Sequence, residues 1–441
     1  MIIFSHTRTP RLQYVVNFLA EYFNTPIRVA FDEEKYLADN DLHKINYSYH
    51  RLQPQEIWIH SHVLLFESAV RPVKAECFDI KSWEDPGQTF KAFFKAEGDL
   101  GFDMFAAIFF LLTRYEEYLP HKKDPYGRYS HESALAYQND FLHLPLINIW
   151  LREFSVFAEQ QIGLQLQLPS FSFLPTYDID MAWSFRNKGM KRNAGGLAKL
   201  LVTGKWRSFS QRLRVLRDKA PDPYDAYEWM DALHARYQVK PIYFFLVAHS
   251  VGRFDKNIDT QNPAFRQLVH YISHHYQTGL HPSWASGDHP ALLTREKSVL
   301  ESITEKPVHF SRQHFIRFTL PDTYRRLIAQ GITNDFSMGY GTINGFRASI
   351  ATAFNWYDLK NESITPLRVQ PFAYMEATSY YEQGMNPGEA AKEMEHYLKL
   401  TLQNNGTLIT IWHNSFLGTD PQSEGWRDVY ENFIATATAT T

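Results

Sequence analysis

The sequence predicts an α/β protein, in which an irregular (β/α)7-type barrel over residues 166–441 follows a smaller mixed α/β domain over residues 1–165. Two observations predict this class. From about residue 166, short apolar runs alternate with stretches of helical periodicity, which is typical of parallel βα units. About seven such units occur in a chain long enough for two domains, and for that number closure into a barrel is more economical than an open sheet.

Composition excludes several classes of protein. A formal net charge of -3 gives no global attraction to nucleic acid or to acidic membranes. The single cysteine, Cys77, excludes an intramolecular disulfide framework and a cysteine-based metal site. Residues 1–23 lack the basic start and apolar run of a secretory signal, and residues 104–112 are far shorter than the roughly 20 that span a bilayer. We expect a soluble, cytoplasmic protein with no nucleic-acid partner and no transmembrane segment, of open oligomeric state.

The N-terminal domain is predicted to be built from short strands and apolar helices. Strands are expected at residues 2–4, 56–60 and 62–66, helices at 11–23 and 102–118, and a Pro/Gly turn at 124–128. The second helix ends in the charged run RYEEY, residues 114–118. We favour docking of this run on the barrel over a ligand surface.

The barrel opens on residues 171–180, FSFLPTYDID, which predict a buried strand ending in two aspartates. Side chains two apart on a strand face the same side, so Asp178 and Asp180 point into one space. Two carboxylates held that close repel each other unless a cation or a shared proton lies between them. A solvated strand end is the alternative interpretation.

Strands and helices then alternate to the end of the chain. Strands are predicted at 241–247, 278–281, 308–310, 331–335, 364–374 and 407–412, and helices at 221–236, 263–276, 295–303, 322–330 and from Pro387, with Asn386 as its cap, to 405. Residues 187–219 are strongly basic. This segment could hold an anionic substrate, but we favour a solvated excursion.

Polar groups follow the predicted strands where a barrel carries its chemistry, at their carboxyl ends. They are the two aspartates, His281, the segment Arg312-Gln313-His314-Phe315, and His413. A single histidine after a strand is usually structural. The joint occurrence of all four groups at one face of a barrel is much harder to attribute to chance.

In these residues the chain resembles the polysaccharide deacetylases of carbohydrate esterase family 4. Residues 176–180 (TYDID) match the family's Thr-Phe-Asp-Asp motif with one inserted residue, and 279–284 (GLHPSW) stand where its His-Ser/Thr-x-x-His motif belongs. Residues 312–315 (RQHF) resemble its arginine motif, Asp335 its aspartate motif, and 411–414 (IWHN) its closing histidine motif. The resemblance covers about residues 166–441. The N-terminal part resembles an uncharacterised domain that precedes such deacetylase domains in some bacterial proteins.

The resemblance implies a divalent metal site, most plausibly for Zn2+, at which water attacks an acetyl group. Asp178 would be the general base, Asp180 and His281 metal ligands, and His413 the acid that protonates the leaving amine. Asp335 would orient or charge-balance His413. Arg312, with Arg347 as a second candidate, would keep the base ionised.

The chain departs from the family at Ala285, where the second metal histidine belongs. Catalytic zinc usually takes three protein ligands and leaves one position open. Our hypothesis is that His314 supplies the missing ligand. Ser283 or Ser286 is a weaker alternative, and loss of the metal is a third.

The leading interpretation is therefore a metal-dependent hydrolase that removes an acetyl group from a sugar, in a polysaccharide or in a lipid- or nucleotide-linked precursor. A carbohydrate-binding or scaffold protein on an inactive barrel is the alternative from a different class. Hydrolysis of another C–N bond, such as a cyclic amide or ureide, is the third. No glycine-rich phosphate loop and no G-x-S-x-G nucleophile motif occurs.

Overall fold

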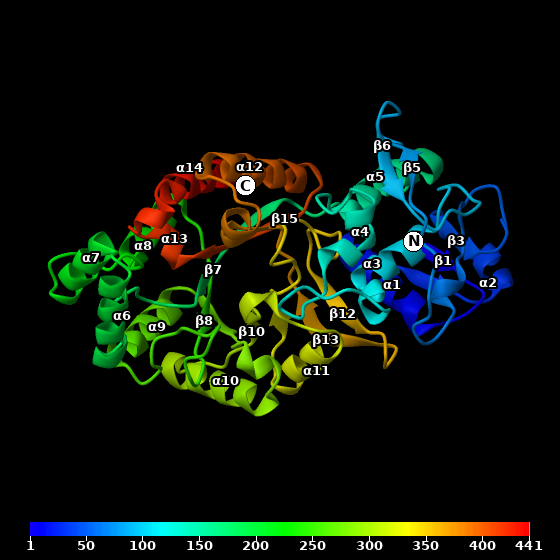
Figure 1. Cartoon of the computed structure of the whole chain (residues 1–441). Helices are drawn as coiled ribbons and strands as arrows, with labels where there is room; N and C mark the ends of the chain where they lie inside the picture. The colour runs from blue at the N-terminus through cyan, green and yellow to red at the C-terminus, as the bar shows by residue number, and fades with distance from the viewer. Residues whose placement is uncertain (441) are drawn as a thin grey trace.

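A computed structural model describes residues 1–440 and contains two main sheets, a small one near the N-terminal end of an elongated molecule and a larger one in its middle (Figure 1). The first has the strand order β2-β1-β3-β4 and is parallel throughout. The second has nine strands in the order β12-β13-β11-β10-β9-β8-β7-β15-β14. These sheets confirm the α/β class with a smaller N-terminal unit, whereas the boundary between residues 165 and 166 stays a prediction.

The N-terminal unit packs helices against its small sheet. Its strands are β1 (Ile2–Phe4), β2 (Arg28–Ala30), β3 (Lys44–Ser48), β4 (Ile57–His60) and the hairpin β5 (Phe78–Lys81) and β6 (Thr89–Ala92). Its helices are α1 (Pro10–Tyr22), α2 (Glu33–Ala38), α3 (Met104–Leu112), α4 (Leu135–Gln138) and α5 (Leu146–Ile162). Helix α1 begins where Thr9 caps it and Pro10 occupies its first position.

Two predicted elements of this unit are wrong in type or length. Residues 62–66 contain a 3-10 turn, Val63–Leu65, instead of a strand. The helix expected over 102–118 ends at Leu112, and a second turn, Tyr115–Tyr118, follows. The chain breaks at Arg114, whose φ of 52° is left-handed and cannot continue an α-helix. This break buries the guanidinium against Glu117, at 2.7 Å.

The barrel begins with β7 (Ser172–Ile179) and alternates with helices to its last strand. Its other strands are β8 (Ile242–Leu246), β9 (Gln277–His281), β10 (Phe310–Ser311), β11 (Asn334–Asp335), β12 (Phe354–Asp358), β13 (Ser363–Val369), β14 (Tyr374–Met375) and β15 (Thr407–His413). Its helices are α6 (Met190–Val202), α7 (Trp206–Leu216), α8 (Tyr227–Tyr237), α9 (Pro263–His275), α10 (Pro290–Thr304), α11 (Asp322–Ala329), α12 (Pro387–Gln403), α13 (Asn414–Leu417) and α14 (Trp426–Ala439). Helix α12 has the predicted cap, because Asn386 and Glu389 form a capping box.

One interrupted strand closes the barrel. The chain leaves β13, which pairs with β11, and after four residues enters β14, which pairs with β15 at the other end of the sheet. Between them, Phe372 N–H donates to Met338 O and Ala373 N–H to Ile409 O, so the connecting residues contact both sides. Counting β13 and β14 as one position, and leaving out the antiparallel edge strand β12, gives seven parallel positions, as predicted. The carboxyl ends of all these parallel strands meet at one mouth.

Buried polar contacts join the two units. Glu117 accepts from Arg347 Nε and Nη2 at 2.9 and 2.7 Å, and both side chains are buried. Tyr14 of α1 donates to Asn355 O on β12 at 2.8 Å. The predicted docking of residues 114–118 on the barrel is therefore confirmed for Glu117, since its contact Arg347 belongs to the barrel.

Within residues 1–440, no helix is both long and apolar enough to cross a membrane.

Candidate active site

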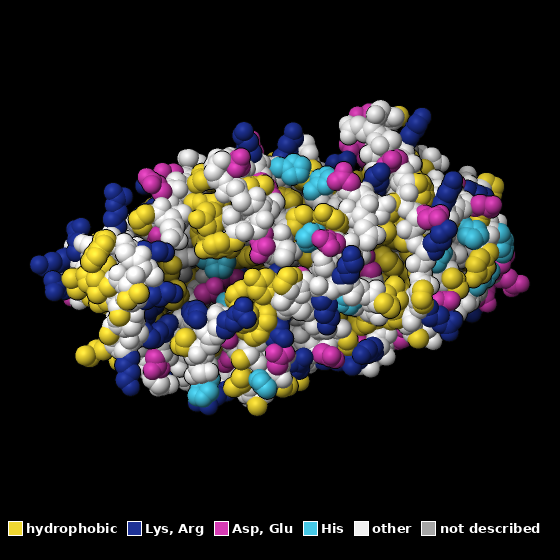
Figure 2. Space-filling model, in the orientation of Figure 1, with side chains coloured by type: hydrophobic (Ala, Val, Ile, Leu, Met, Phe, Trp, Pro, Cys, Tyr) yellow, Lys and Arg dark blue, Asp and Glu magenta, His cyan; other side chains and the backbone are white. Residues whose placement is uncertain are grey.

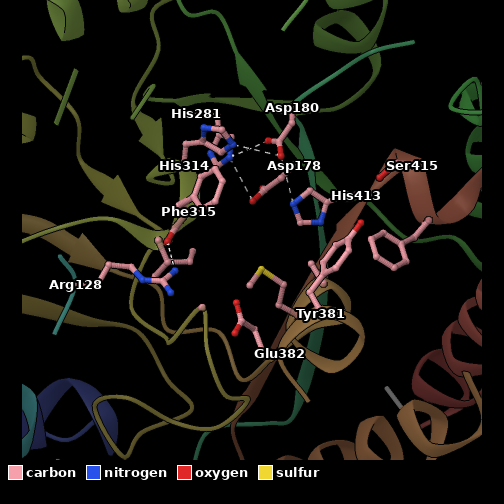
Figure 3. Close-up of a pocket in the computed structure, with 15 residues that line it drawn as sticks. Arg128, Asp178, Asp180, His281, His314, Phe315, Tyr381, Glu382, His413 and Ser415 are labelled. Carbon is pink, nitrogen blue, oxygen red and sulfur yellow. Dashed lines mark hydrogen bonds and ion pairs between the residues drawn. The ribbon is translucent and has the colours of Figure 1, made fainter. Parts of the chain in front are cut away.

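A polar pocket of about 240 Å3 opens at the carboxyl ends of β7, β9 and β15. Figure 2 shows a hollow on this face of the molecule, with histidine and acidic side chains in it and apolar ones around it. Figure 3 shows the side chains that line it: Asp178, Asp180, His281, His314 and His413 converge from separate elements. The structure thus brings together five of the eight residues that the sequence singled out, and Arg312 stands directly behind them.

Asp180 lies at the centre of the polar cluster. Its Oδ1 is 3.2 Å from His281 Nε2, and its Oδ2 is 3.4 Å from His314 Nε2. Buried Oδ1 accepts no hydrogen bond of good geometry from the described residues. Burial raises the pKa of Asp180, but His314 and the neighbouring histidines outweigh it, so that this pKa lies well below its usual value.

The far nitrogens of both histidines are held by fixed acceptors. His281 Nδ1 lies 2.5 Å from Arg312 O, and His314 Nδ1 lies 2.9 Å from Asp255 Oδ1. A nitrogen that donates to such an acceptor leaves the other nitrogen, Nε2, to face the pocket with a lone pair. This arrangement is typical of metal-ligating histidines.

These residues fit a divalent metal ion. One ligand atom each from Asp180, His281 and His314 lies within 4.8 Å of the others, as one ion in their midst requires. Two imidazole nitrogens and one carboxylate form a donor set that suits zinc. Without an ion, the repulsion between these closely spaced acceptors is reduced only if one of them carries a proton. Burial lowers the pKa of His314, but Asp180 and Asp255 outweigh burial and raise it to about 9.

Asp178 occupies the adjacent wall of the pocket. Its Oδ1 accepts from Arg312 Nη1 at 2.8 Å, and its Oδ2 lies 3.7 Å from His281 Nε2. The Arg312 side chain is fully buried under the site, where it also donates to Phe336 O. A buried guanidinium at this distance keeps the carboxylate in place.

His413 faces Asp180 from the end of β15, at 3.8 Å between Nε2 and Oδ2. Its Nδ1 lies 2.7 Å from Glu376 Oε1, which also accepts from the His413 backbone N–H at 2.7 Å. Burial lowers the pKa of His413, but the fully buried Glu376 outweighs this and raises it to about 10. This pKa favours the protonated imidazole, and the ring nitrogen that faces the pocket is Nε2.

Two predicted residues lie outside this cluster. Asp335, which was expected to orient His413, accepts from the hydroxyls of Ser311 and Ser337 at 2.8 and 3.0 Å. Glu376, and not Asp335, binds and orients His413. Arg347 does not contact Asp178, because its guanidinium is bonded to Glu117 and to Gly339 O. Both residues are buried and paired elsewhere, so the roles expected for them at the pocket have no geometric support.

The serines considered as alternative ligands bind a buried acid instead. Ser283 Oγ donates to Glu296 Oε1 at 2.5 Å, and its backbone N–H donates to Oε2 at 3.0 Å. Ser286 Oγ donates to Ser283 O at 2.8 Å. Ala285 Cβ, where the family places a histidine, offers no donor atom. Of the candidates for the third ligand, only His314 places a donor atom beside Asp180.

Glu296 makes stability depend on pH. Burial raises the pKa of Glu296 from its ordinary value of 4.5 to about 7, although the hydrogen bonds from Ser283 lower it. The folded state then holds its proton more tightly than the unfolded state, so the stabilisation is complete below about pH 4.5 and is lost as pH rises through 7. We expect Glu296→Gln to flatten the pH dependence of the free energy of unfolding in that window, on the order of 2–3 kcal/mol. Urea denaturation at several pH values measures this, and an unchanged slope would contradict it.

Two acids and one arginine of the site were not predicted. Asp255 lies well inside the loop after β8, and Glu376 follows the two-residue strand β14, so neither stands at the end of a strand whose limits the sequence predicted. A carboxylate directly after a strand was the available signal for Glu376. The third, Arg128, is buried and comes from the N-terminal unit.

Arg128 reaches the pocket wall across the junction between the units. Its Nη1 donates to Phe315 O at 2.6 Å, its Nε to Asp124 at 2.6 Å, and its buried Nη2 has no partner among the described residues. Phe315 and Ile316 have left-handed φ values of 60° and 53°, which are strained for non-glycine residues. This turn presents Phe315 O to Arg128 (Figure 3).

The fold and the site define an α/β-barrel protein with a candidate three-ligand metal centre. Residues 1–162 match the model of a family of unknown function, DUF7033. No curated protein matches the chain.

Solved structures similar to this one include two deacetylases and an allantoinase. The "putative polysaccharide deacetylase from Mycobacterium smegmatis" is 13% identical, with 62% of this chain and 85% of that chain covered and a TM-score of 0.41. PuuE allantoinase is 9% identical (61% and 84% covered, TM-score 0.40), and a probable polysaccharide deacetylase from Pseudomonas aeruginosa PAO1 is 11% identical (61% and 85%, TM-score 0.40).

Proposed function

We propose that the protein is a metal-dependent hydrolase that removes an acetyl group from an acetylated sugar, as part of a polysaccharide or of a glycan precursor. One observation carries the proposal. Asp180, His281 and His314 converge on one point, with the Asp178 carboxylate on one side and the His413 imidazole on the other. A hydrolase of amides needs a base, an acid and an electrophile in this arrangement.

The residues of the chain divide the proton transfers between them. Asp178, held by Arg312, accepts a proton from the attacking water as its oxygen bonds to the acetyl carbon. His413 then gives its Nε2 proton to the sugar nitrogen as the C–N bond breaks, so that acetate and a free amine leave. When bound by Asp180, His281 and His314, a divalent ion such as zinc would act as a Lewis acid on the acetyl carbonyl and on the attacking water.

Glu376 has a defined part in this scheme. By binding His413 Nδ1 at 2.7 Å it directs the other ring nitrogen to the substrate and keeps the imidazole protonated before reaction. This is the role that the sequence had given to Asp335. A cytoplasmic site of action stays part of the proposal, and it favours a precursor over a finished polysaccharide.

Metal content is the first test. We expect the purified protein to hold about one divalent ion per chain by elemental mass spectrometry, because three ligands suffice for a catalytic zinc site. Asp180→Ala, His281→Ala and His314→Ala should each lose this ion, since two ligands hold it weakly.

A matched control is His309→Ala, which removes an exposed barrel histidine bonded to Gly331 O outside the pocket. This variant should keep the metal. Retention of the ion by His314→Ala would disprove the third ligand. A parent protein that stays metal-free after incubation with zinc, cobalt or nickel would favour the non-catalytic carbohydrate-binding alternative. Release of acetate from a panel of acetylated sugars, compared with cyclic amides and ureides, then separates the two hydrolase readings.

A further inference from the structure

The helical hairpin of α6 and α7 projects from the barrel at one end of the molecule (Figure 1). Helix α6 has no buried residue, and α7 has only Val215. Helices of a globular protein normally owe their position to an apolar face buried in the core. This hairpin covers almost none of the core, so its apolar residues call for another explanation.

The tip of the hairpin is apolar and exposed. Residues 201–207 form an unbroken exposed run across the turn. Val202 and Trp206 are 88% and 66% exposed, and Leu201 beside them is 42% exposed. The turn holds them together, because Gly204 N–H donates to Leu201 O and Lys205 N–H to Leu200 O. A soluble protein gains nothing from presenting a tryptophan and two aliphatic side chains in this way.

Positive charge surrounds this apolar tip. Residues 188–219 contain ten Lys and Arg side chains and one acid, a formal charge of +9 in a chain whose total is -3. Seven of the basic residues are exposed, and none of these seven has an ion-pair partner within residues 1–440. They are Lys191, Lys199, Lys205, Arg207, Arg214, Arg217 and Lys219. Figure 2 shows these basic side chains next to apolar ones at the left end of the molecule.

We propose that the α6–α7 hairpin docks the protein on an anionic phospholipid surface. Leu201, Val202 and Trp206 enter the headgroup region, where tryptophan is favoured. Lys199, Lys205 and Arg207 bind lipid phosphates beside them, as the basic face of an interfacial helix does. Nucleic acid would attract the same cations, but it offers aliphatic side chains nowhere to be buried.

The hairpin lies on the side of the barrel that carries the chemistry. It follows β7 directly in the chain, after the carboxyl end that bears Asp178 and Asp180. In Figure 2 the hairpin and the hollow over the site are visible on the same face. Docking would therefore hold the mouth of the pocket beside the bilayer. The inference does not rest on the proposed hydrolase activity, and its test requires no substrate.

The test is co-sedimentation of the full-length protein with vesicles of phosphatidylcholine alone or mixed with phosphatidylglycerol. We expect binding to the mixed vesicles to be at least about tenfold stronger, and to fall when salt is raised to roughly 0.3 M. Lys199→Glu/Lys205→Glu/Arg207→Glu should weaken it by about 100-fold or more, since each cation contributes about a factor of five. Equal binding to both vesicle types would overturn the inference.

The apolar contribution is tested separately. Leu201→Ser/Val202→Ser/Trp206→Ser keeps the charge and should still weaken binding by about tenfold or more. Leu42→Ser, at a residue 84% exposed in the N-terminal unit, is its control. Lys122→Glu/Lys123→Glu/Lys360→Glu makes the same change in net charge at exposed sites elsewhere. Both controls should bind like the parent. Tighter binding to a DNA duplex, with no effect of the serine variant, would instead identify nucleic acid and overturn the proposal.

Discussion

Replacing Asp178 by asparagine is expected to lower kcat for acetate release by about 10²–10⁴-fold while the metal content stays at the parental level. The substitution keeps the shape of the side chain and an oxygen for Arg312, but removes the carboxylate that stands beside the cluster of Asp180, His281 and His314. Acetate release from the best substrate of the sugar panel gives kcat, and elemental mass spectrometry on the same sample gives the metal content.

The combination of the two readouts separates base from ligand. Loss of metal together with activity would show that Asp178 is itself a ligand, and unchanged activity would show that another group is the base. Asp231→Asn is the control, because Asp231 lies on α8 and accepts from Tyr271 and Tyr276 away from the pocket. It should leave both readouts at parental values.

Removal of the Glu117 carboxylate is expected to cost about 3–5 kcal/mol of the free energy of unfolding, the loss typical of a broken buried ion pair. Glu117 is the shared partner of Arg114 and Arg347, and both guanidinium groups are buried. Burial raises the pKa of Glu117, but the two arginines outweigh this effect and lower the pKa to about 2. They therefore stabilise the buried carboxylate. In Glu117→Ala, buried Arg347 would lose its counter-charge, and buried Arg114 would keep only Glu116, at 2.8 Å.

Urea denaturation of Glu117→Ala and the parent measures this difference. The control is Glu431→Ala, which breaks the exposed pair with Arg236 and should leave the midpoint unchanged, because such pairs contribute little. A loss for Glu117→Ala no larger than that of the control would show that the junction between the units is not held by this pair.

Much of the fold could be predicted, because apolar runs in the sequence indicate the longer strands of the barrel. The predicted strand at 241–247 corresponds to β8, and that at 407–412 to β15. The short strands β10, β11 and β14 carry too few residues for periodicity to place them exactly. Helix α5 escaped prediction although it is the longest helix of the N-terminal unit, and the antiparallel strand β12 also gave no recognised signal.

The site shows the same division. The sequence alone places the residues at the ends of recognisable strands on one mouth of the barrel: Asp178, Asp180, His281 and His413. The partner of a buried charged group can come from a segment far away in the sequence. The sequence therefore suggested Asp178 as the partner of Arg347, whereas the structure pairs Arg347 with Glu117. The role of Glu376 was given to Asp335 for the same reason.

The closeness of Arg128 to the barrel limits which side chains position 341 can carry. A Cβ added at Gly341 would lie 2.2 Å from Arg128 Nη1, so the barrel has a residue without a side chain where the other unit passes. A side chain gained at position 341 would displace this guanidinium and with it the hydrogen bond to Phe315 O. Because Arg128 belongs to the N-terminal unit, a barrel cut free of that unit would lack part of its pocket wall.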